Sequence, residues 1–104
     1  GTMLAIQQGA LRLRYRNGFD RPAPLLTPAD VVTANVDFPP IAYRIAAGHR
    51  IGLHISSASF PRLERHMNGA GLNTLSATPR IARNTLWFGP DGGSALVLPV
   101  QPSH

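Results

Sequence analysis

The feature that most constrains the fold of this chain is an alternation of apolar and polar residues with a period of two. Between residues 10 and 16, Leu11, Leu13 and Tyr15 alternate with three arginines. Successive side chains of a strand point to opposite faces, so this pattern predicts a half-buried strand over 10–16. By the same reasoning, further extended or strand segments are expected at 32–38, 41–46, 51–55, 85–88 and 95–98.

Glycine and proline separate these segments. The 104 residues include 10 Gly and 10 Pro, and both residues interrupt helices, which argues against a helical bundle. Turns are predicted at Asn17-Gly18, at Ala47-Gly48 and at 89–93, the last joining two antiparallel strands in a hairpin. Residues 19–30 are expected to form an ordered but non-helical connection, and residues 60–80 a long irregular segment. The fold class predicted is therefore all-β, with a sandwich or jelly roll as the default.

The positive charge of the chain comes entirely from arginine. Ten cations oppose five anions, for a net charge of +5, and there is no lysine. Phosphate binding, a genome-wide preference for arginine codons, and a basic face that docks on an acidic partner all remain open explanations. On the predicted strand, Arg12, Arg14 and Arg16 form a candidate docking face. Tyr15 lies on the opposite face, which counts against single-stranded nucleic-acid binding.

No pattern of catalytic or ligand-binding residues is present. The chain has no cysteine. The segment Gly92-Gly93-Ser94-Ala95-Leu96 begins like the Gly-x-Ser-x-Gly elbow of serine hydrolases but lacks its last glycine. His49 and His54 would lie on opposite faces of one strand, and Glu64 is the only glutamate. There is no dinucleotide or phosphate loop. The sequence therefore predicts no catalytic residue, no metal site and no cofactor.

The first residues carry no structural signal. Residues 1–8 are interpreted as a tag remnant or lead-in. They are not interpreted as a signal peptide, because Gly-Thr-Met has neither the charged nor the apolar region of one. No apolar run is long enough to cross a membrane. These observations favour a cytoplasmic protein without membrane contact.

Three stretches in order resemble a known family. They are LRLRYRNG at 11–18, AGHRIGLHISSASFPR at 47–62, and ARNTLW followed by SALVLPV within 82–100. Together they resemble the C-terminal β-sandwich domain of the X-Pro dipeptidyl-peptidase and cocaine esterase family of serine hydrolases. The resemblance implies a jelly roll of galactose-binding-like topology. Residues 9–102 would be a part of that domain, without its first strands. It also implies that the nucleophile, acid and histidine belong to a separate α/β-hydrolase domain.

A partial jelly roll leaves apolar faces and strand edges without cover. The expected partners are therefore the α/β-hydrolase domain, the first half of the jelly roll, or a second copy bound by strand pairing. The surface expected to contact another domain lies within 56–69, where serines can satisfy backbone groups, an aromatic ring can cap the core and an amide can anchor the next loop. Its members are Ser56, Ser57, Ser59, Phe60, Arg62 and Asn68.

The function expected from these observations is structural. The chain would support the catalytic domain of a hydrolase acting on peptides, esters or amides, help it to oligomerise, and have no activity alone. The alternative is a free-standing β-sandwich module that binds a carbohydrate or an acidic partner. For a carbohydrate, Trp87 is the only tryptophan that could form a stacking platform.

Overall fold

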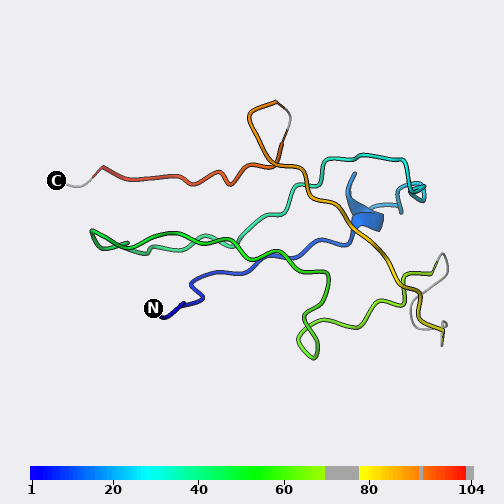
Figure 1. Cartoon of the computed structure of the whole chain (residues 1–104), viewed down its shortest axis with the longest axis horizontal. Coiled ribbons are helices and arrows are strands. Elements are labelled where there is room, and N and C mark those ends of the chain that lie inside the picture. The colour runs from blue at the N-terminus through cyan, green and yellow to red at the C-terminus, as the bar shows by residue number, and fades with distance from the viewer. Residues whose placement is uncertain (70–77, 92, 103–104) are drawn as a thin grey trace. The chain divides into compact units, whose positions relative to one another are not determined.

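The computed structural model describes residues 1–69, 78–91 and 93–102 of the chain (Figure 1). Its one regular element in these ranges is η1, a 3₁₀ helix at Leu13–Tyr15. Turns and irregular chain make up the rest of the described residues, and none of them forms a β-strand. The chain divides into two units, Gly1–Ser57 and Ala58–His104, and each is described by itself.

The predicted all-β jelly roll is wrong, and residues 10–16 show why. Where a strand was expected, the Tyr15 N–H donates to the Arg12 carbonyl at 2.8 Å and the Arg16 N–H donates to the Leu13 carbonyl at 3.2 Å. Such bonds, each spanning three residues, are those of a 3₁₀ helix. Alternation specifies which side chains would share a face, but a strand also needs a neighbouring strand for its hydrogen bonds. Residues 10–16 form bonds within themselves instead.

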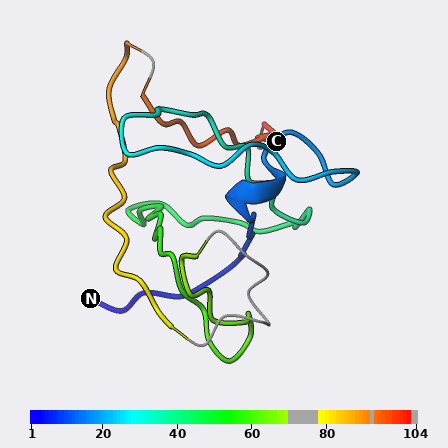
Figure 2. The ribbon, with the colours of Figure 1, turned by 90° about the vertical axis from the view of Figure 1, so that its right-hand side faces the viewer.

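The chain turns sharply after η1 and returns to it (Figures 1 and 2). The Gly18 N–H donates to the Tyr15 carbonyl at 3.1 Å, and the φ of Gly18 is 134°. A turn is therefore present, but its central pair is Arg16-Asn17, one residue before the predicted pair Asn17-Gly18. The Ala23 N–H then donates to the Arg14 carbonyl at 2.6 Å. Ala23 is 5% exposed and is the one buried apolar residue in the part of the chain that the structure describes.

Residues 40–55, named the arm below, reverse direction at their centre (Figure 1). The His49 N–H donates to the Ala46 carbonyl at 3.1 Å, and Gly48 has a φ of 84°, so the predicted turn at Ala47-Gly48 is confirmed. Within 40–55, all of which are described, this is the only backbone hydrogen bond. The strand expected at 51–55 is therefore absent, and the stretch at 41–46, expected to be extended, is not part of a sheet.

Residues 7–9 lie against residues 37–39 in the opposite direction. The Gln7 Nε2 donates to the Pro39 carbonyl at 2.7 Å. A Cβ on Gly9 would lie 2.5 Å from the Asp37 carbonyl oxygen, so only glycine permits this close approach of two backbones. The strand expected at 32–38 is not formed, although its end contacts another segment of the same unit.

The second unit contains a loop that the sequence predicts in part. The Ser94 N–H donates to the Trp87 carbonyl at 2.7 Å and the Gly93 N–H to the Gly89 carbonyl at 3.2 Å, so the chain turns over 89–93; residue 92 lies outside the described residues. Beyond these bonds the two flanking segments leave the loop in different directions (Figures 1 and 2). The turn is confirmed, but the hairpin strands at 85–88 and 95–98 are not formed.

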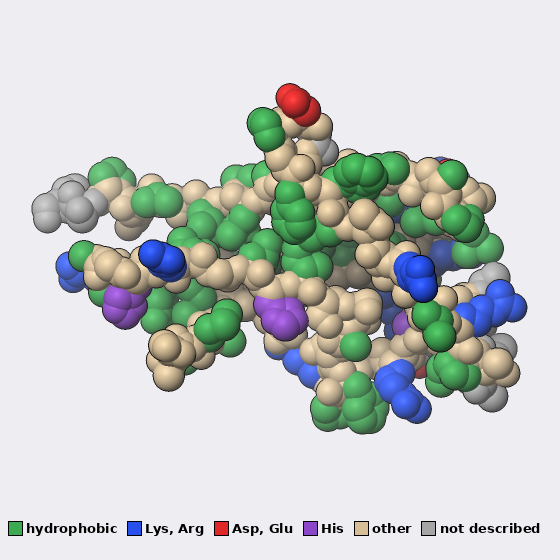
Figure 3. Space-filling model, viewed as in Figure 1, with side chains coloured by type: hydrophobic (Ala, Val, Ile, Leu, Met, Phe, Trp, Pro, Cys, Tyr) green, Lys and Arg blue, Asp and Glu red, His purple; other side chains and the backbone are tan. Residues whose placement is uncertain are grey.

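Little apolar surface is buried. Among the residues that the structure describes, Ala23 is the one buried apolar residue. Hydrophobic side chains lie on the surface along the chain (Figure 3). Residues expected in a strand core are half exposed, with Ile51 and Leu53 both at 51% and Ile55 at 55%. A chain with this much exposed apolar surface lacks the main driving force that stabilises a compact fold.

Candidate functional site

The surface predicted within 56–69 falls in both units. Ser56 and Ser57 end the first unit, whereas Ser59, Phe60, Arg62 and Asn68 belong to the second. Both Ser56 and Ser59 interact with other groups of the protein.

The second-unit part begins with a turn at Ser59–Leu63. The Leu63 N–H donates to the Ser59 carbonyl at 2.8 Å, and the Phe60–Pro61 peptide bond is cis. Phe60 is 69% exposed, so it does not cap a core as expected. The Arg65 guanidinium carbon lies 5.9 Å from the centre of the Phe60 ring, within the range of a cation–π contact. The turn thus presents an aromatic ring with a cation above it.

Asn68 joins two parts of the second unit that are distant in sequence. Its side-chain Nδ2 donates to the Arg80 carbonyl at 2.8 Å, and the Arg80 N–H donates to the Met67 carbonyl at 2.9 Å. The Asn68 N–H donates to Nδ1 of His66 at 3.0 Å. Its φ of 57° lies in the left-handed region that asparagine tolerates. These bonds bring residues 67–68 beside residue 80; residues 70–77 of the irregular segment lie outside the described residues.

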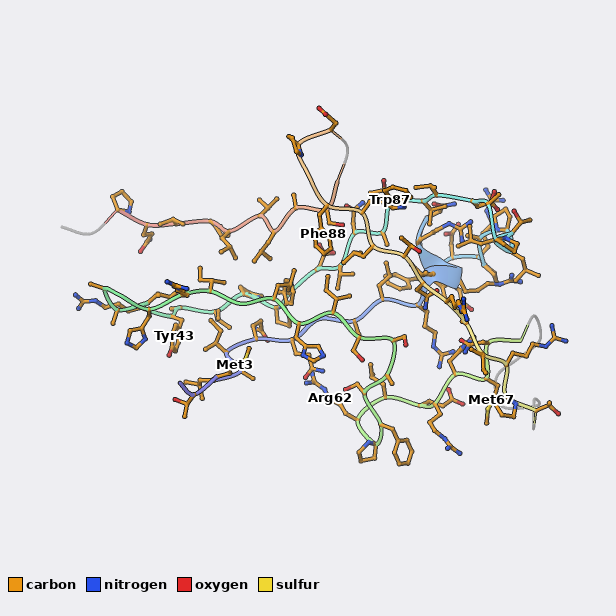
Figure 4. The ribbon with its side chains drawn as sticks, viewed as in Figure 1. Met3, Tyr43, Arg62, Met67, Trp87 and Phe88 are labelled. Carbon is orange, nitrogen blue, oxygen red and sulfur yellow. The ribbon has the colours of Figure 1, made fainter. Side chains whose placement is uncertain are left out.

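Arg62 lies within the turn at Ser59–Leu63. It comes from the same segment as Met67 (Figure 4), is exposed, and interacts with other groups of the chain. The structure therefore shows two separate anchoring points in this segment, the turn at Ser59–Leu63 and the bonds of Asn68. The sequence pointed to Asn68, but it did not indicate Arg80 or Arg65 as contacts.

The three arginines of the expected docking face have three different surroundings. Because η1 replaces the strand, they do not form a stripe. The Arg16 guanidinium donates to the carbonyls of Leu13 and Pro24 at 2.9 and 3.0 Å. Arg14 is half-buried, and its Nη1 is buried without a hydrogen-bond partner. Arg12 is exposed and has interactions of its own.

A hollow of about 440 Å³ lies beside η1 in the first unit. The Tyr15 and Phe19 rings line it and are tilted by 31°, with their centres 6.3 Å apart. Arg16 and Asp37 also line this hollow. The Arg16 guanidinium is directed to carbonyl groups, so it serves the fold of this region rather than an open binding site.

Asp30 closes a turn that was not predicted from the sequence. Its carboxylate accepts a hydrogen bond from the Thr27 N–H at 2.7 Å, and its own N–H donates to the Thr27 carbonyl at 3.0 Å. The hydrogen bonds from Thr27 hold the pKa of Asp30 below its usual value, with a smaller contribution from the charge of Arg16. Pro28 at the second position of this turn is the sequence signal that could have revealed it.

In the residues that the structure describes, no group of three or more His, Asp or Glu side chains is placed to hold a metal ion. In the same ranges, no helix is long and apolar enough to cross a membrane. The geometry thus offers anchored loops, a basic region around η1 and exposed apolar side chains. These features are suited to contact with another protein surface.

Comparison with known proteins agrees with the family resemblance of the sequence. Residues 1–97 match the family described as the X-Pro dipeptidyl-peptidase C-terminal non-catalytic domain. Cocaine esterase from Rhodococcus sp. (strain MB1 Bresler) is 28% identical over 102 residues, which are 96% of this chain and 18% of the esterase. The chain therefore spans less than a fifth of this relative. No solved structure has significant similarity to it.

Proposed function

The chain belongs to the family of X-Pro dipeptidyl-peptidase C-terminal non-catalytic domains, and we propose that it supports the catalytic domain of a serine hydrolase. In this role it contacts the catalytic domain and contributes to oligomerisation. The substrate of the complete hydrolase would be an ester, an amide or an X-Pro peptide, as the names of the family and of the similar esterase suggest.

The observation that carries this proposal is the exposure of apolar side chains in both units. Val31 is 73% exposed, Trp87 61%, Ile81 98% and Val97 86%. Many exposed apolar side chains, in a chain with one buried apolar residue among those described, support a surface that another protein covers. The match with 18% of the esterase supports the same view, because most of that relative lies outside the matched region and could provide the cover.

The anchored segments of the second unit are the proposed contact surface. Ser59, Phe60, Arg62 and Asn68 belong to a stretch that is fixed at two points, the turn at Ser59–Leu63 and the bonds of Asn68. Ser56 and Ser57 are proposed to contribute from the first unit. An aromatic ring with an arginine above it is a frequent component of protein interfaces.

Activity measurements test the non-catalytic role. The purified chain should not hydrolyse a nitrophenyl ester or an X-Pro anilide above the rate of buffer. Hydrolysis that a serine-reactive phosphonate blocks would overturn the proposal. Sedimentation tests oligomerisation, for which self-association is expected because apolar surface is exposed; a stable monomer at micromolar concentration would contradict it.

A second candidate function is a free-standing module that binds a carbohydrate. It is favoured by Trp87 and Phe88, two neighbouring aromatic residues that are 61% and 75% exposed and precede the loop at 89–93 (Figure 4). Binding on a glycan array that Trp87→Ala abolishes, together with quenching of Trp87 fluorescence by the same glycan in the unchanged chain, would support this function. The hydrolase role predicts neither effect.

A further inference from the structure

We propose that Asn17 is a site of spontaneous deamidation, and that hydrogen bonds protect the second Asn-Gly pair of the chain, Asn68-Gly69, from the same reaction. Of the asparagines in the chain, only these two precede glycine. Both side chains are exposed, so exposure does not distinguish them. The bonds that hold each pair do.

The reaction needs a backbone nitrogen that can reach the asparagine side chain before it. The nitrogen of Gly18 loses its proton to water or hydroxide and attacks Cγ of Asn17, so that a new C–N bond forms. The bond between Cγ and Nδ2 then breaks, the amide nitrogen takes up a proton and leaves as ammonia, and a succinimide ring remains. Water opens this ring at either carbonyl group, which gives aspartate or isoaspartate. Glycine favours the attack because it has no Cβ to obstruct the approach.

Asn17 meets these requirements in the folded chain. It lies in the turn that follows η1, and its side chain has no hydrogen-bond partner among the residues that the structure describes. The Gly18 N–H donates to the Tyr15 carbonyl at 3.1 Å, so this bond has to open before the nitrogen can attack. A single bond at the end of a 3₁₀ helix of 3 residues opens at a small cost in free energy. The side chain of Asn17 is then able to rotate to the nitrogen.

Asn68 is held at its side chain and at its backbone. Its Nδ2, the atom that would leave as ammonia, donates to the Arg80 carbonyl at 2.8 Å. The Asn68 N–H donates to Nδ1 of His66 at 3.0 Å, and the Arg80 N–H donates to the Met67 carbonyl at 2.9 Å. Rotation of the Asn68 amide toward the nitrogen of Gly69 breaks the bond of Nδ2 and loosens the contact with Arg80. The same dipeptide is therefore expected to react more slowly here than at Asn17.

The two products at residue 17 differ in their effect on the turn. Aspartate leaves the backbone unchanged, so the Gly18 N–H still reaches the Tyr15 carbonyl. Isoaspartate places the side-chain methylene group in the backbone before Gly18, and this added atom moves the N–H away from the Tyr15 carbonyl. Either product lowers the net charge of +5 by one. Deamidation at Asn17 is thus a covalent change that opens the turn after η1 whenever isoaspartate is formed.

The experiment follows both pairs in the same molecule. The full 104-residue chain is incubated at neutral and at mildly alkaline pH, with and without urea, and digested with trypsin. Trypsin cleaves after arginine, so Asn17 and Asn68 fall in different peptides. Mass spectrometry measures the conversion of each asparagine relative to the sample at time zero, and chromatography separates the aspartate and isoaspartate peptides. Asn35, which precedes valine, is the internal control, and Asn17→Gln, which would have to close a larger ring, is the matched variant.

Without urea, we expect Asn17 to be converted about tenfold faster than Asn68, since more hydrogen bonds hold Asn68. Its rate should rise with pH, because the attacking nitrogen has to lose a proton. In urea the two rates should become similar, mainly through faster conversion of Asn68. Asn17→Gln should abolish conversion at residue 17 and leave Asn68 unchanged. Amide exchange at residue 18 should be faster in the separated isoaspartate form than in Asn17→Asp.

Three results would overturn the proposal in different ways. If Asn17 is not converted faster than Asn35 in the folded chain, it is not a deamidation site. If Asn68 reacts as fast as Asn17 without urea, its hydrogen bonds do not protect it. If Asn17 reacts faster than Asn68 by the same factor with and without urea, the neighbouring sequence sets the rates and protection by the fold is excluded.

Discussion

Residues 12–24, named the η1 region, and the arm have similar lengths and similar alternating sequences, but they differ in how much of their structure they support themselves. The η1 region contains the 3₁₀ helix, a turn, a bond that returns Ala23 to Arg14, and the buried Ala23 side chain. The arm has one backbone hydrogen bond and no buried residue. The difference shows that alternation alone does not order a segment.

The two regions differ because backbone groups of the η1 region have hydrogen-bond partners close by in the sequence. In the η1 region, carbonyl groups meet N–H groups three residues away, and the Arg16 side chain reaches the carbonyls of Leu13 and Pro24. Closing such short loops costs little chain entropy. The arm has apolar residues but no nearby surface to bury them. Beyond its turn, the arm therefore has few contacts that would order it.

The largest effect is expected for Ala23→Glu. Ala23 is 5% exposed, so a longer, charged side chain would force residues 19–24 away from η1 and break the bond to the Arg14 carbonyl. The free energy of opening at the Ala23 amide should fall by about 1–3 kcal/mol, measured by hydrogen exchange. The matched control, Ala47→Glu at the exposed tip of the arm, should change the protection of the His49 amide by less than about 0.5 kcal/mol.

Unchanged protection of the residue-23 amide in Ala23→Glu would show that burial at this position does not order the η1 region. A large loss of His49 amide protection in Ala47→Glu would show that contacts within the arm stabilise its turn, as contacts within the η1 region stabilise that region. Either result would remove the distinction between the two regions.

The glycines of the two turns give a second comparison. Gly18 has a φ of 134° and Gly48 a φ of 84°, and an alanine is strained at both, by about 1–2 kcal/mol. Asparagine tolerates the left-handed region near φ 57°, which Gly48 approaches and Gly18 does not. Amide exchange at residues 18 and 49 should therefore show that Gly48→Asn is milder than Gly48→Ala. Gly18→Asn should be as damaging as Gly18→Ala. Equal recovery by asparagine at both positions would contradict this difference.

The same contrast explains what the sequence could predict. Turns depend on the conformational freedom of residues next to each other. Those predicted at Ala47-Gly48 and at 89–93 are present, and the one predicted at Asn17-Gly18 forms one residue earlier. The family could also be identified, because its signal lies in the order of residues. The strands could not be predicted correctly, since their hydrogen bonds need partners that a pattern along one segment does not specify.

The candidate surface follows the same rule. Asn68 could be chosen as an anchor because asparagine forms local hydrogen bonds readily. Its partner is the Arg80 carbonyl, twelve residues away, and no local pattern indicates which backbone group lies there. The exposure of Phe60 was also missed, because an aromatic residue beside an apolar segment is as compatible with a core as with the arginine contact found.

Substitutions of Arg16 test how much its side chain stabilises the η1 region. Arg16→Gln removes the charge and at least one of the two bonds to the Leu13 and Pro24 carbonyls, so protection of the Ala23 amide should fall by about 1 kcal/mol. Arg16→Lys should lie between, because an ammonium group does not reproduce the planar fork of guanidinium. Arg50→Gln in the arm is the control, for which no change in His49 protection is expected. A similar loss in both regions would mean that general charge, not the two bonds, is responsible.

The smallest effect concerns Asp30, which follows the η1 region. The bonds from Thr27 lower the pKa of its carboxyl below the usual value of 3.8. The carboxylate therefore stabilises the turn at Thr27–Asp30 when the pH is above the pKa of the unfolded chain. This stabilisation is lost as the pH falls through the lower pKa of the folded turn. The chemical shift of the Thr27 amide should report the transition, with a small effect on stability because the carboxyl is exposed to solvent. Asp30→Asn should keep an oxygen acceptor and abolish this acid transition, whereas a transition that survives in Asp30→Asn would assign it to another group.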